Sequence, residues 1–366
     1  ELMGDGIKKL ADSSFDLEGI LTQATGSPLL ALITGILATS LVQSSSTTTA
    51  IVVGLVGTGV LPLTNAIPVI MGANIGTTVT NTIVSMGHIT QPEEFRRAMA
   101  GATVHDFFNW LSVLILLPLE LAFNIISAPA KALAAKIPTL SGSEIADTPF
   151  DIFAKWLGSS VLQGIPGLVA LVGVLLLFLA LRYLVVILKS LVLGRSESAL
   201  DKYVFGKPLL AMGFGVVLTF LVQSSSVTTS LVIPLIGAGV LTVRQVFPYM
   251  LGSNVGTTAT ALLAALLTAQ DYPEFAVTIA LCHLMFNVFG IALVYPITFV
   301  REIPIRMAEF VGSLAFKNRA YAVAYIVVLF YGLPLLLELI FAPGGTGGTA
   351  PLAPDTTPLD TLSSGG

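Results

Sequence analysis

The sequence predicts an all-α polytopic membrane protein, organised as an inverted-topology repeat with two re-entrant helical hairpins and discontinuous transmembrane helices. Three observations predict this fold: a very apolar composition, a segment that occurs twice, and a block of polar residues inside each copy. Of the 366 residues, 54% are hydrophobic and 10% are charged, and the mean hydropathy is +0.90. Soluble domains carry about 25% charged residues. The chain therefore lacks the charged groups that cover a surface in water.

Apolar stretches long enough to cross a bilayer recur along the whole chain. A transmembrane helix takes about 20 apolar residues, and the clearest candidates lie at roughly 99–119, 161–188, 275–299 and 320–341. A single signal anchor does not account for segments that recur so far along the chain. We expect a multi-pass membrane protein that contacts the lipid bilayer and not nucleic acid.

Cysteine and asparagine usage favours a bacterial inner (plasma) membrane. Cys282 is the single cysteine and lies within an apolar stretch, so a disulfide within the chain is excluded. No Asn-x-Ser/Thr glycosylation acceptor occurs in the sequence.

An internal repeat organises the chain. A shift of 180 residues, from Gln43 to Gln223, brings two copies into register, and two residues drop out before the last landmark. The landmarks are QSSS at 43–46 and 223–226, GANIGTTVT at 72–80 with GSNVGTTAT at 252–260, and HDFFN at 105–109 with HLMFN at 283–287. Three polar landmarks in the same order indicate that the two copies share one fold.

Each QSSS block lies at the tip of a predicted hairpin. In the first copy the apolar arms on either side of the block, Pro28–Val42 and Thr47–Leu61, are too short to cross a bilayer. We therefore expect both arms to enter and leave on the same face. An unpaired N–H group in lipid costs several kcal/mol, so the tip must lie inside protein or line a cavity.

The number of crossings between the two hairpins sets their relative orientation. We expect three: Thr64–Gly87 with a break at Gly72–Gly76, then Phe95–Ile126, and finally Val161–Leu193. An odd number puts the second hairpin on the opposite face, which gives the inverted repeat of many secondary transporters. Most Lys and Arg residues then lie on one face, which the positive-inside rule makes cytoplasmic.

These boundaries divide the chain into six parts. They are an external amphipathic lead-in (1–27), the first repeat (28–126), an external connector with a linking transmembrane helix (127–207), the second, inverted repeat (208–299), a cytoplasmic loop with a C-terminal transmembrane helix (300–341) and a disordered tail (342–366). The tail is rich in Gly, Pro and Thr, a composition typical of linkers.

The QSSS blocks are suited to bind an anion. Serine is a preferred N-cap residue, because its oxygen accepts from the free N–H groups of the first helical turn. The start of such a helix also presents the positive end of the helix dipole. Two tips that approach from opposite faces would therefore meet around one small anion. The alternative is that Ser and Thr let membrane helices pack closely, but packing does not require a glutamine at the same position twice.

The missing charges indicate a second, cationic ligand. No Lys, Arg, Asp or Glu occurs from Pro28 to Asn81, and Arg244 is the single one from Pro208 to Ala261. Burial of an unpaired anion is prohibitive, so we expect a hard cation such as Na⁺ to bind with it. The available oxygen donors are the amides of Gln43 and Gln223 and the hydroxyls of Thr77, Thr80, Thr257 and Thr260.

The chain resembles the type II sodium/phosphate cotransporter family in its doubled QSSS, in GANIGTTVTNTIV and in EFRRAMAGATVHDFFNWLSVLILLPLE, over roughly 28–126 and 200–335. The resemblance implies a secondary active symporter, not an enzyme, that couples inward Na⁺ movement to uptake of inorganic phosphate. The phosphate ligands it implies are Gln43, Ser44, Ser45, Ser46, Asn74, Gln223, Ser224, Ser225, Ser226 and Asn254. By resemblance Gln223, Thr257 and Thr260 form a sodium site. The other expected sodium ligands are Gln43, Thr77, Thr80 and Ser224.

Two further polar features lie within apolar stretches. The pairs His105/Asn109 and His283/Asn287 each lie one helical turn apart on one face. We interpret them either as functional groups or as bonds that lock one helix to another. Asp106 occurs in the first copy only and is a candidate gate or proton-sensitive group.

Two other functions stay open at this point, and a third is disfavoured. A passive anion channel can also use helix ends, and a symporter of another oxyanion would share the architecture. An intramembrane serine hydrolase would need one nucleophile with one oriented base. Here the serines come in matched pairs, and no Gly-x-Ser-x-Gly elbow occurs.

Overall fold

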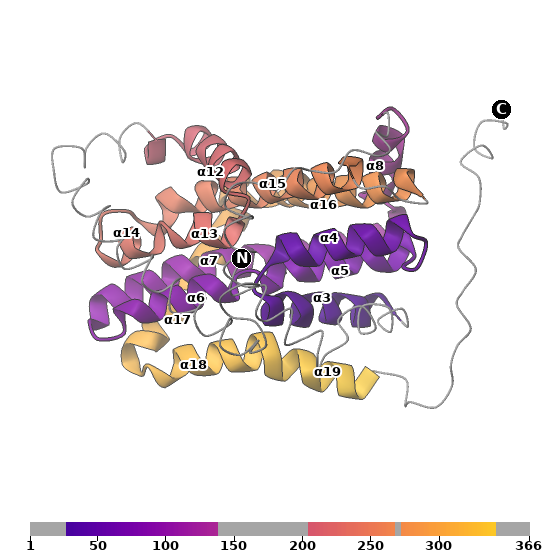
Figure 1. Cartoon of the computed structure of the whole chain (residues 1–366). Helices are drawn as coiled ribbons and strands as arrows, with labels where there is room; N and C mark the ends of the chain where they lie inside the picture. Colours follow the sequence, from indigo (N-terminus) through magenta and orange to yellow (C-terminus); the bar gives the residue numbers. More distant parts are fainter. Residues whose placement is uncertain (1–26, 138–203, 268–271, 342–366) are drawn as a thin grey trace, which may run out of the picture.

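The computed structural model describes residues 27–137, 204–267 and 272–341, and every regular element in these ranges is helical (Figure 1). The expectation of an all-α membrane protein is confirmed at this level. The expected lead-in, the linking span at 161–188 and the tail lie outside the described residues.

The helices follow the two copies of the repeat. The first copy and the residues after it form α3 (Pro28–Val42), α4 (Ser45–Gly57), α5 (Leu63–Gly76), α6 (Val79–Ser85), the 3-10 turn η2 (Met86–His88), α7 (Pro92–Phe123) and α8 (Ser127–Ala134). The second copy forms α12 (Pro208–Val222), α13 (Ser225–Ser230), α14 (Ile233–Gly237), α15 (Val243–Leu267) and α16 (Pro273–Val294). The C-terminal part forms α17 (Thr298–Lys317), α18 (Ala320–Ile326), the π-helix η6 (Val327–Gly332) and α19 (Leu333–Phe341).

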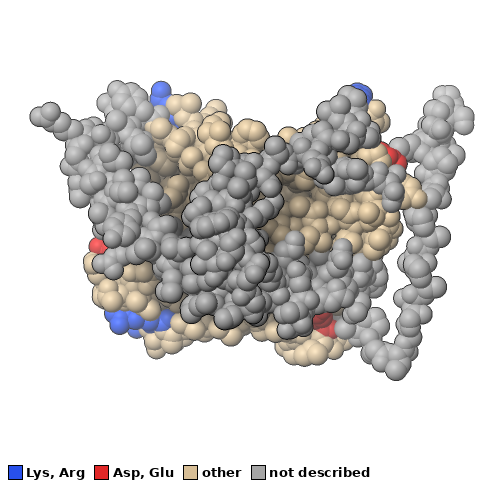
Figure 2. All heavy atoms as spheres, viewed as in Figure 1, with Lys and Arg blue, Asp and Glu red and all other residues tan. Residues whose placement is uncertain are grey.

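Among the described residues, four helical segments are long and apolar enough to cross a membrane: Leu63–His88, Pro92–Phe123, Pro273–Val294 and Ala320–Ile340. Three of the four spans that composition marked most clearly fall on these segments, and the fourth, 161–188, lies outside the described residues. The surface agrees with a membrane setting. On the face drawn in Figure 2, the charged side chains of the described residues lie at the periphery, and the rest of their surface is uncharged.

The first arm of each hairpin is short because a proline lies in its first turn and a glutamine caps its end. Pro28 and Pro208 occupy the first turn of α3 and α12, a position where the missing N–H is not needed. Both helices are 15 residues long and end at a glutamine in the left-handed conformation. The apolar arms Pro28–Val42, Ser45–Gly57, Pro208–Val222 and Ser225–Gly237 therefore stay below spanning length.

Glycines set the same close helix packing in both copies. A Cβ atom on Gly35 of α3 would collide with the Val69 carbonyl oxygen of α5, and one on Gly215 of α12 would collide with the Tyr249 carbonyl oxygen of α15. These two glycines are 180 residues apart, as the internal repeat requires. The first hairpin arm and the helix after the hairpin therefore pack in the same way in each copy.

The break expected at Gly72–Gly76 lies slightly later in the chain. α5 continues to Gly76, and the interruption falls at Thr77 and Thr78, whose hydroxyls donate to the carbonyl oxygens of Ala73 (2.8 Å) and Ile75 (2.7 Å). Such bonds compete with the regular helix ladder. Gly72 and Gly76 instead serve the close contact with α3, because a Cβ on either would collide with its backbone.

The second copy departs from the expected pattern in two places. α15 runs unbroken from Val243 to Leu267, so the discontinuity of the first copy is not repeated there. The second hairpin is interrupted instead, between α13 and α14, ahead of Pro234. After this copy we expected a loop, whereas Thr298–Lys317 is a helix of 20 residues that packs against α7.

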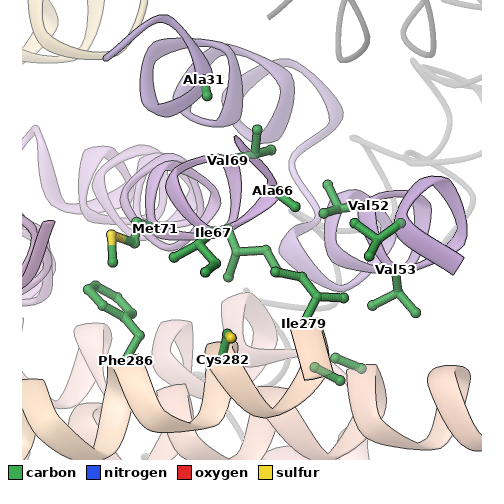
Figure 3. Close-up of a cluster of buried hydrophobic side chains, with 14 of the residues drawn as sticks. Ala31, Val52, Val53, Ala66, Ile67, Val69, Met71, Ile279, Cys282 and Phe286 are labelled. Carbon is green, nitrogen blue, oxygen red and sulfur yellow. The ribbon is translucent and has the colours of Figure 1, made fainter. Parts of the chain in front are cut away.

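The core joins elements from both copies (Figure 3). Val52 of α4, Ile67 of α5 and Ala31 of α3 belong to the same buried cluster as Ile279 and Phe286 of α16. Cys282 is buried in this cluster as well, as expected for a thiol in an apolar stretch. The first hairpin is therefore packed on a helix of the second copy.

The glycine contacts give a prediction with an internal control. Gly215→Ala puts a methyl group into the α15 backbone and should destabilise the protein by about 1–3 kcal/mol, as overpacking does. Gly213→Ala, two residues earlier in α12, meets no atom within 4 Å and should be neutral. Thermal unfolding of both variants in detergent measures the difference. Equal stability of the two variants would contradict the packing.

Candidate functional site

The first hairpin tip is fixed by the side chain of Gln43. The residue caps the end of α3 with φ 58°, and its backbone N–H donates to the Thr39 carbonyl oxygen at 2.8 Å. Its side-chain amide donates to the Ser40 carbonyl oxygen. Its Oε1 atom accepts from the Thr80 hydroxyl at 2.8 Å. One side chain thus closes the end of α3 and binds α6.

The second tip repeats this arrangement. Gln223 has φ 58°, its amide donates to the Phe220 carbonyl oxygen at 2.6 Å, and its Oε1 atom accepts from the Thr260 hydroxyl at 2.8 Å. Among the described residues, only Gln43, Asn124 and Gln223 have positive φ without being glycine. Because left-handed backbone is uncommon for such residues, its occurrence at both QSSS blocks marks a shared, specified geometry.

The serines start the next helix at each tip. Ser44 and Ser224 are N-caps whose side chains accept from the N–H groups of Thr47 (3.2 Å) and Val227 (3.3 Å). The residues that follow, Ser45 and Ser225, are 5% and 4% exposed. Within the described part of the chain, no hydrogen bond engages the hydroxyls of four serines. They are Ser45, Ser46, Ser225 and Ser226. These donors stay available to a ligand.

The threonines expected to bind sodium fall into two groups. Thr80 and Thr260 meet the glutamine oxygens, as described above. The hydroxyls of Thr77 and Thr257 donate to carbonyl oxygens of their own helices, Ala73 (2.8 Å) and Ser253 (3.0 Å). The structure therefore brings Gln43 to Thr80 and Gln223 to Thr260, and leaves Thr77 and Thr257 bonded locally.

A buried His–Asn network links the two copies. His105 Nε2 lies 2.6 Å from Asn254 Oδ1, and His283 Nε2 lies 3.3 Å from Asn74 Oδ1. Each histidine thus pairs with the asparagine of the other copy. Further bonds extend the network. Asn254 Nδ2 donates to Asn109 Oδ1 (2.9 Å), Asn109 Nδ2 to the Asn74 carbonyl oxygen (2.8 Å) and Asn74 Nδ2 to the Ile70 carbonyl oxygen (3.1 Å). Asn287 Nδ2 donates to the carbonyl oxygens of His283 (3.2 Å) and Asn254 (3.5 Å).

This network affects the expected phosphate ligands. Asn74 and Asn254 are 5% and 4% exposed. In each residue, both the nitrogen and the oxygen of the side-chain amide have a hydrogen-bond partner within the protein. The arrangement favours the interpretation of the His–Asn pairs as bonds between helices. Phosphate binding by Asn74 and Asn254 stays a prediction.

Sequence reasoning missed three polar residues whose hydrogen bonds reach the hairpins or α7. Asn81 Oδ1 accepts from the hydroxyls of Thr229 (2.9 Å) and Ser230 (3.1 Å) in α13. The Tyr325 hydroxyl donates to Asp106 Oδ2 at 2.7 Å, and the Tyr331 hydroxyl donates to the Ser40 carbonyl oxygen at 3.0 Å. The sequence contains two features that could have identified these residues. Asn81 aligns with an alanine in the second copy, and both tyrosines lie inside an apolar span.

Asp106 is fully buried between these elements. Its Oδ2 atom accepts from Tyr325, and Oδ1 has no hydrogen-bond partner. The other buried carboxylate of the described residues, Glu120, accepts from the N–H groups of Ile126 and Ser127 and so caps the start of α8. Asp106 is therefore the one buried carboxylate that does not close a helix end in the described chain.

Comparisons with known proteins find related sequences. A family model described as Na+/Pi-cotransporter matches residues 1–117 and 175–337. The chain is 38% identical over 405 residues to the sheep protein named Sodium-dependent phosphate transport protein 2A, with 90% of this chain and 63% of the relative covered. It is 36% identical over 420 residues to the human protein named Sodium-dependent phosphate transport protein 2B, with 89% and 60% covered.

The chain spans about three fifths of the length of these relatives. No solved structure matches it. The family model covers well over half of the chain, including both hairpins and both His–Asn pairs, and the chain belongs to the Na+/Pi-cotransporter family.

Proposed function

We propose that the protein is a secondary active symporter of the plasma membrane that couples inward Na⁺ movement to uptake of inorganic phosphate. The observation that carries this proposal is the duplicated tip. A left-handed glutamine, a serine N-cap and a threonine hydroxyl 37 residues along the chain recur with the same bonds in both copies. The relatives named as sodium-dependent phosphate transport proteins support the choice of ions.

The serine side of the tips suits phosphate. Ser45 and Ser225 lie at the first positions of α4 and α13, where helical N–H groups lack partners within the helix. Their hydroxyls are free of other bonds, as are those of Ser46 and Ser226. Donors at helix starts with the positive dipole end match a small oxyanion. We assign Gln43, Ser44, Gln223 and Ser224 to the same site as its supporting frame.

The glutamine side of the tips suits Na⁺. From Pro28 to Asn81 the chain has no ionisable Lys, Arg, Asp or Glu, so a bound phosphate needs a mobile positive charge. The Oε1 atoms of Gln43 and Gln223, with the hydroxyls of Thr80 and Thr260, offer neutral oxygens of the kind that hard cations prefer. Charge balance then makes each ion promote binding of the other.

The packing between copies supports a shared site that opens to alternate faces. α4 of the first hairpin packs against α15 and α16 of the second copy, and α13 of the second hairpin packs against α6 of the first. In Figure 1, α3 and α4 lie in the right half of the view and α13 and α14 in the left half. This is the arrangement expected if the hairpins are re-entrant and enter from opposite faces.

A passive anion channel is the second candidate function. It would use the same helix starts but would not need Na⁺ to bind the anion. Uptake of labelled phosphate into proteoliposomes, with Na⁺ or with choline outside, separates the two. Uptake that is equal in choline would replace the symporter with the channel, and competition by sulfate would test another oxyanion.

Removal of one serine hydroxyl should weaken phosphate binding. A hydrogen bond to a charged group contributes about 1.5–3 kcal/mol, so Ser45→Ala or Ser225→Ala should raise the phosphate concentration for half-maximal uptake about ten- to hundredfold. Ser313→Ala in α17 is the matched control, because this exposed hydroxyl bonds only its own helix. Phosphate kinetics at saturating Na⁺ measure the effect. Wild-type affinity in both tip variants would move the anion site elsewhere.

Loss of a glutamine or threonine oxygen should weaken Na⁺ binding more directly than phosphate binding. Gln223→Ala and Thr260→Val should shift Na⁺ activation to higher concentration, and saturating Na⁺ should restore part of the phosphate affinity, because coupling between ligands is reciprocal. Uptake over a grid of both ion concentrations measures this. Ser225→Ala is the contrast, since excess Na⁺ should not fully rescue it. Identical grids for the serine and glutamine variants would argue against separate sites.

Cysteine labelling tests the inverted arrangement. Val60 and Thr242 are exposed residues at the outer ends of the two hairpins, and Cys282 is buried and serves as the unlabelled background. Single Val60→Cys and Thr242→Cys variants should react with a membrane-impermeant reagent from opposite sides of oriented vesicles. Labelling of both from one side would exclude hairpins that enter from opposite faces.

A further inference from the structure

A tyrosine of the C-terminal span touches the first hairpin tip. α18, η6 and α19 form one apolar segment, Ala320–Ile340, with the π-helical turn η6 in its middle. Such π turns are rare and are frequent at functional sites. Tyr331 lies in this turn, and its hydroxyl donates to the Ser40 carbonyl oxygen at 3.0 Å.

The Ser40 carbonyl is the point at which the first tip bends. The same oxygen accepts from the side-chain amide of Gln43. Tyr331 and Gln43 therefore donate to the same carbonyl oxygen at the end of α3. Gln43 in turn presents its Oε1 atom to Thr80, so the tyrosine acts on this oxygen through the glutamine.

The π turn itself is held in place from two sides. Phe330, next to Tyr331, is fully buried in the core cluster that contains α3, α4 and α5 residues. The Tyr325 ring meets the Phe330 ring edge-on, with centroids 6.0 Å apart, and its hydroxyl donates to Asp106. η6 and α19 both contact α3. The Tyr331 hydroxyl is thus presented from a fixed backbone.

The second tip has no equivalent brace in the described part of the chain. The Phe220 carbonyl oxygen, which corresponds to that of Ser40, accepts from Gln223 at 2.6 Å, and no side chain of another described element donates to it. Gln223 is exposed among the described residues, whereas Gln43 is half-buried. Two tips with the same internal bonds therefore differ in their external support.

We propose that Tyr331 is a positioning residue for the first tip: it fixes the Ser40–Gln43 bend and so preorganises the Gln43 and Thr80 oxygens for Na⁺. This inference rests on the proposed sodium coupling. It assigns the C-terminal span a part in the transport site, and it makes the first tip the braced one of the two. Loss of the hydroxyl removes one of the two donors to the Ser40 carbonyl oxygen, which loosens the bend that positions Gln43 and weakens Na⁺ binding without removal of a ligand.

Tyr331→Phe tests the proposal because it removes only the hydroxyl. The loss of one hydrogen bond should raise the Na⁺ concentration for half-maximal phosphate uptake about three- to tenfold, while the maximal rate at saturating Na⁺ stays within about twofold. Tyr321→Phe is the matched control, since this tyrosine lies in the same span and is 52% exposed. An unchanged Na⁺ dependence in Tyr331→Phe would overturn the proposal.

A double-mutant cycle separates positioning from general support of the fold. The effect of Tyr331→Phe should disappear when Gln43 is already replaced by alanine and should persist in the Gln223→Ala background, because only contacting residues couple. The shift of the unfolding temperature with Na⁺ concentration, measured on each purified variant, gives the coupling even in variants that do not transport. Equal effects in both backgrounds would reduce Tyr331 to a structural residue. Wild-type uptake without Na⁺ dependence would instead refute the proposed function, and the thermal titration would still decide the role of Tyr331.

Discussion

The architecture depends on a glutamine side chain that ends a helix inside an apolar protein. The last carbonyl groups of a helix lack partners within it, and a bilayer offers no water to satisfy them. The side-chain nitrogen of Gln43 donates to the Ser40 carbonyl oxygen, and the side-chain oxygen of Gln43 accepts from the Thr80 hydroxyl of α6. This pair of bonds lets α3 stop halfway and lets a serine-capped helix begin at once. The same bonds at Gln223 let a second serine-capped helix begin at α13.

The two tips can act together only if the copies are held in register, and the His–Asn network supplies this constraint. His105 and His283 each reach across to the asparagine of the other copy. Hydrogen bonds are strong in a buried, low-dielectric setting, so the bonds of these histidines to Asn254 and Asn74 favour one relative position of α5, α7, α15 and α16. The apolar core adds to this, because α4 and α5 pack on α16. The buried apolar core of the described residues is therefore shared between the two copies.

The sequence predicts what is local and what repeats. The proline starts, the short arms and the serine caps follow from residue chemistry, and the alignment of copies predicts that Gln43 and Gln223 behave alike. It does not predict which copy supplies the partner of each histidine, because alignment relates positions and does not pair them. The break after α5 was misplaced for a physical reason: Gly72 and Gly76 suggest flexibility, but they serve helix contact, and the Thr77 and Thr78 hydroxyls interrupt the helix.

Some polar residues occur in one copy of the repeat and are replaced by apolar residues in the other. Asn81, which binds α13, and Asp106, which binds Tyr325, align with Ala261 and Leu284 in the second copy. In a symporter of the proposed kind, two identical inverted copies would give inward-open and outward-open states of equal free energy. Polar contacts present in one copy only must stabilise one of these states over the other, and a ligand shifts the balance only through its own difference in affinity. In the proposed symporter, the asymmetric contacts around α6, α7 and the C-terminal span would therefore favour one of the two states, whereas the bonds that the two tips share would not.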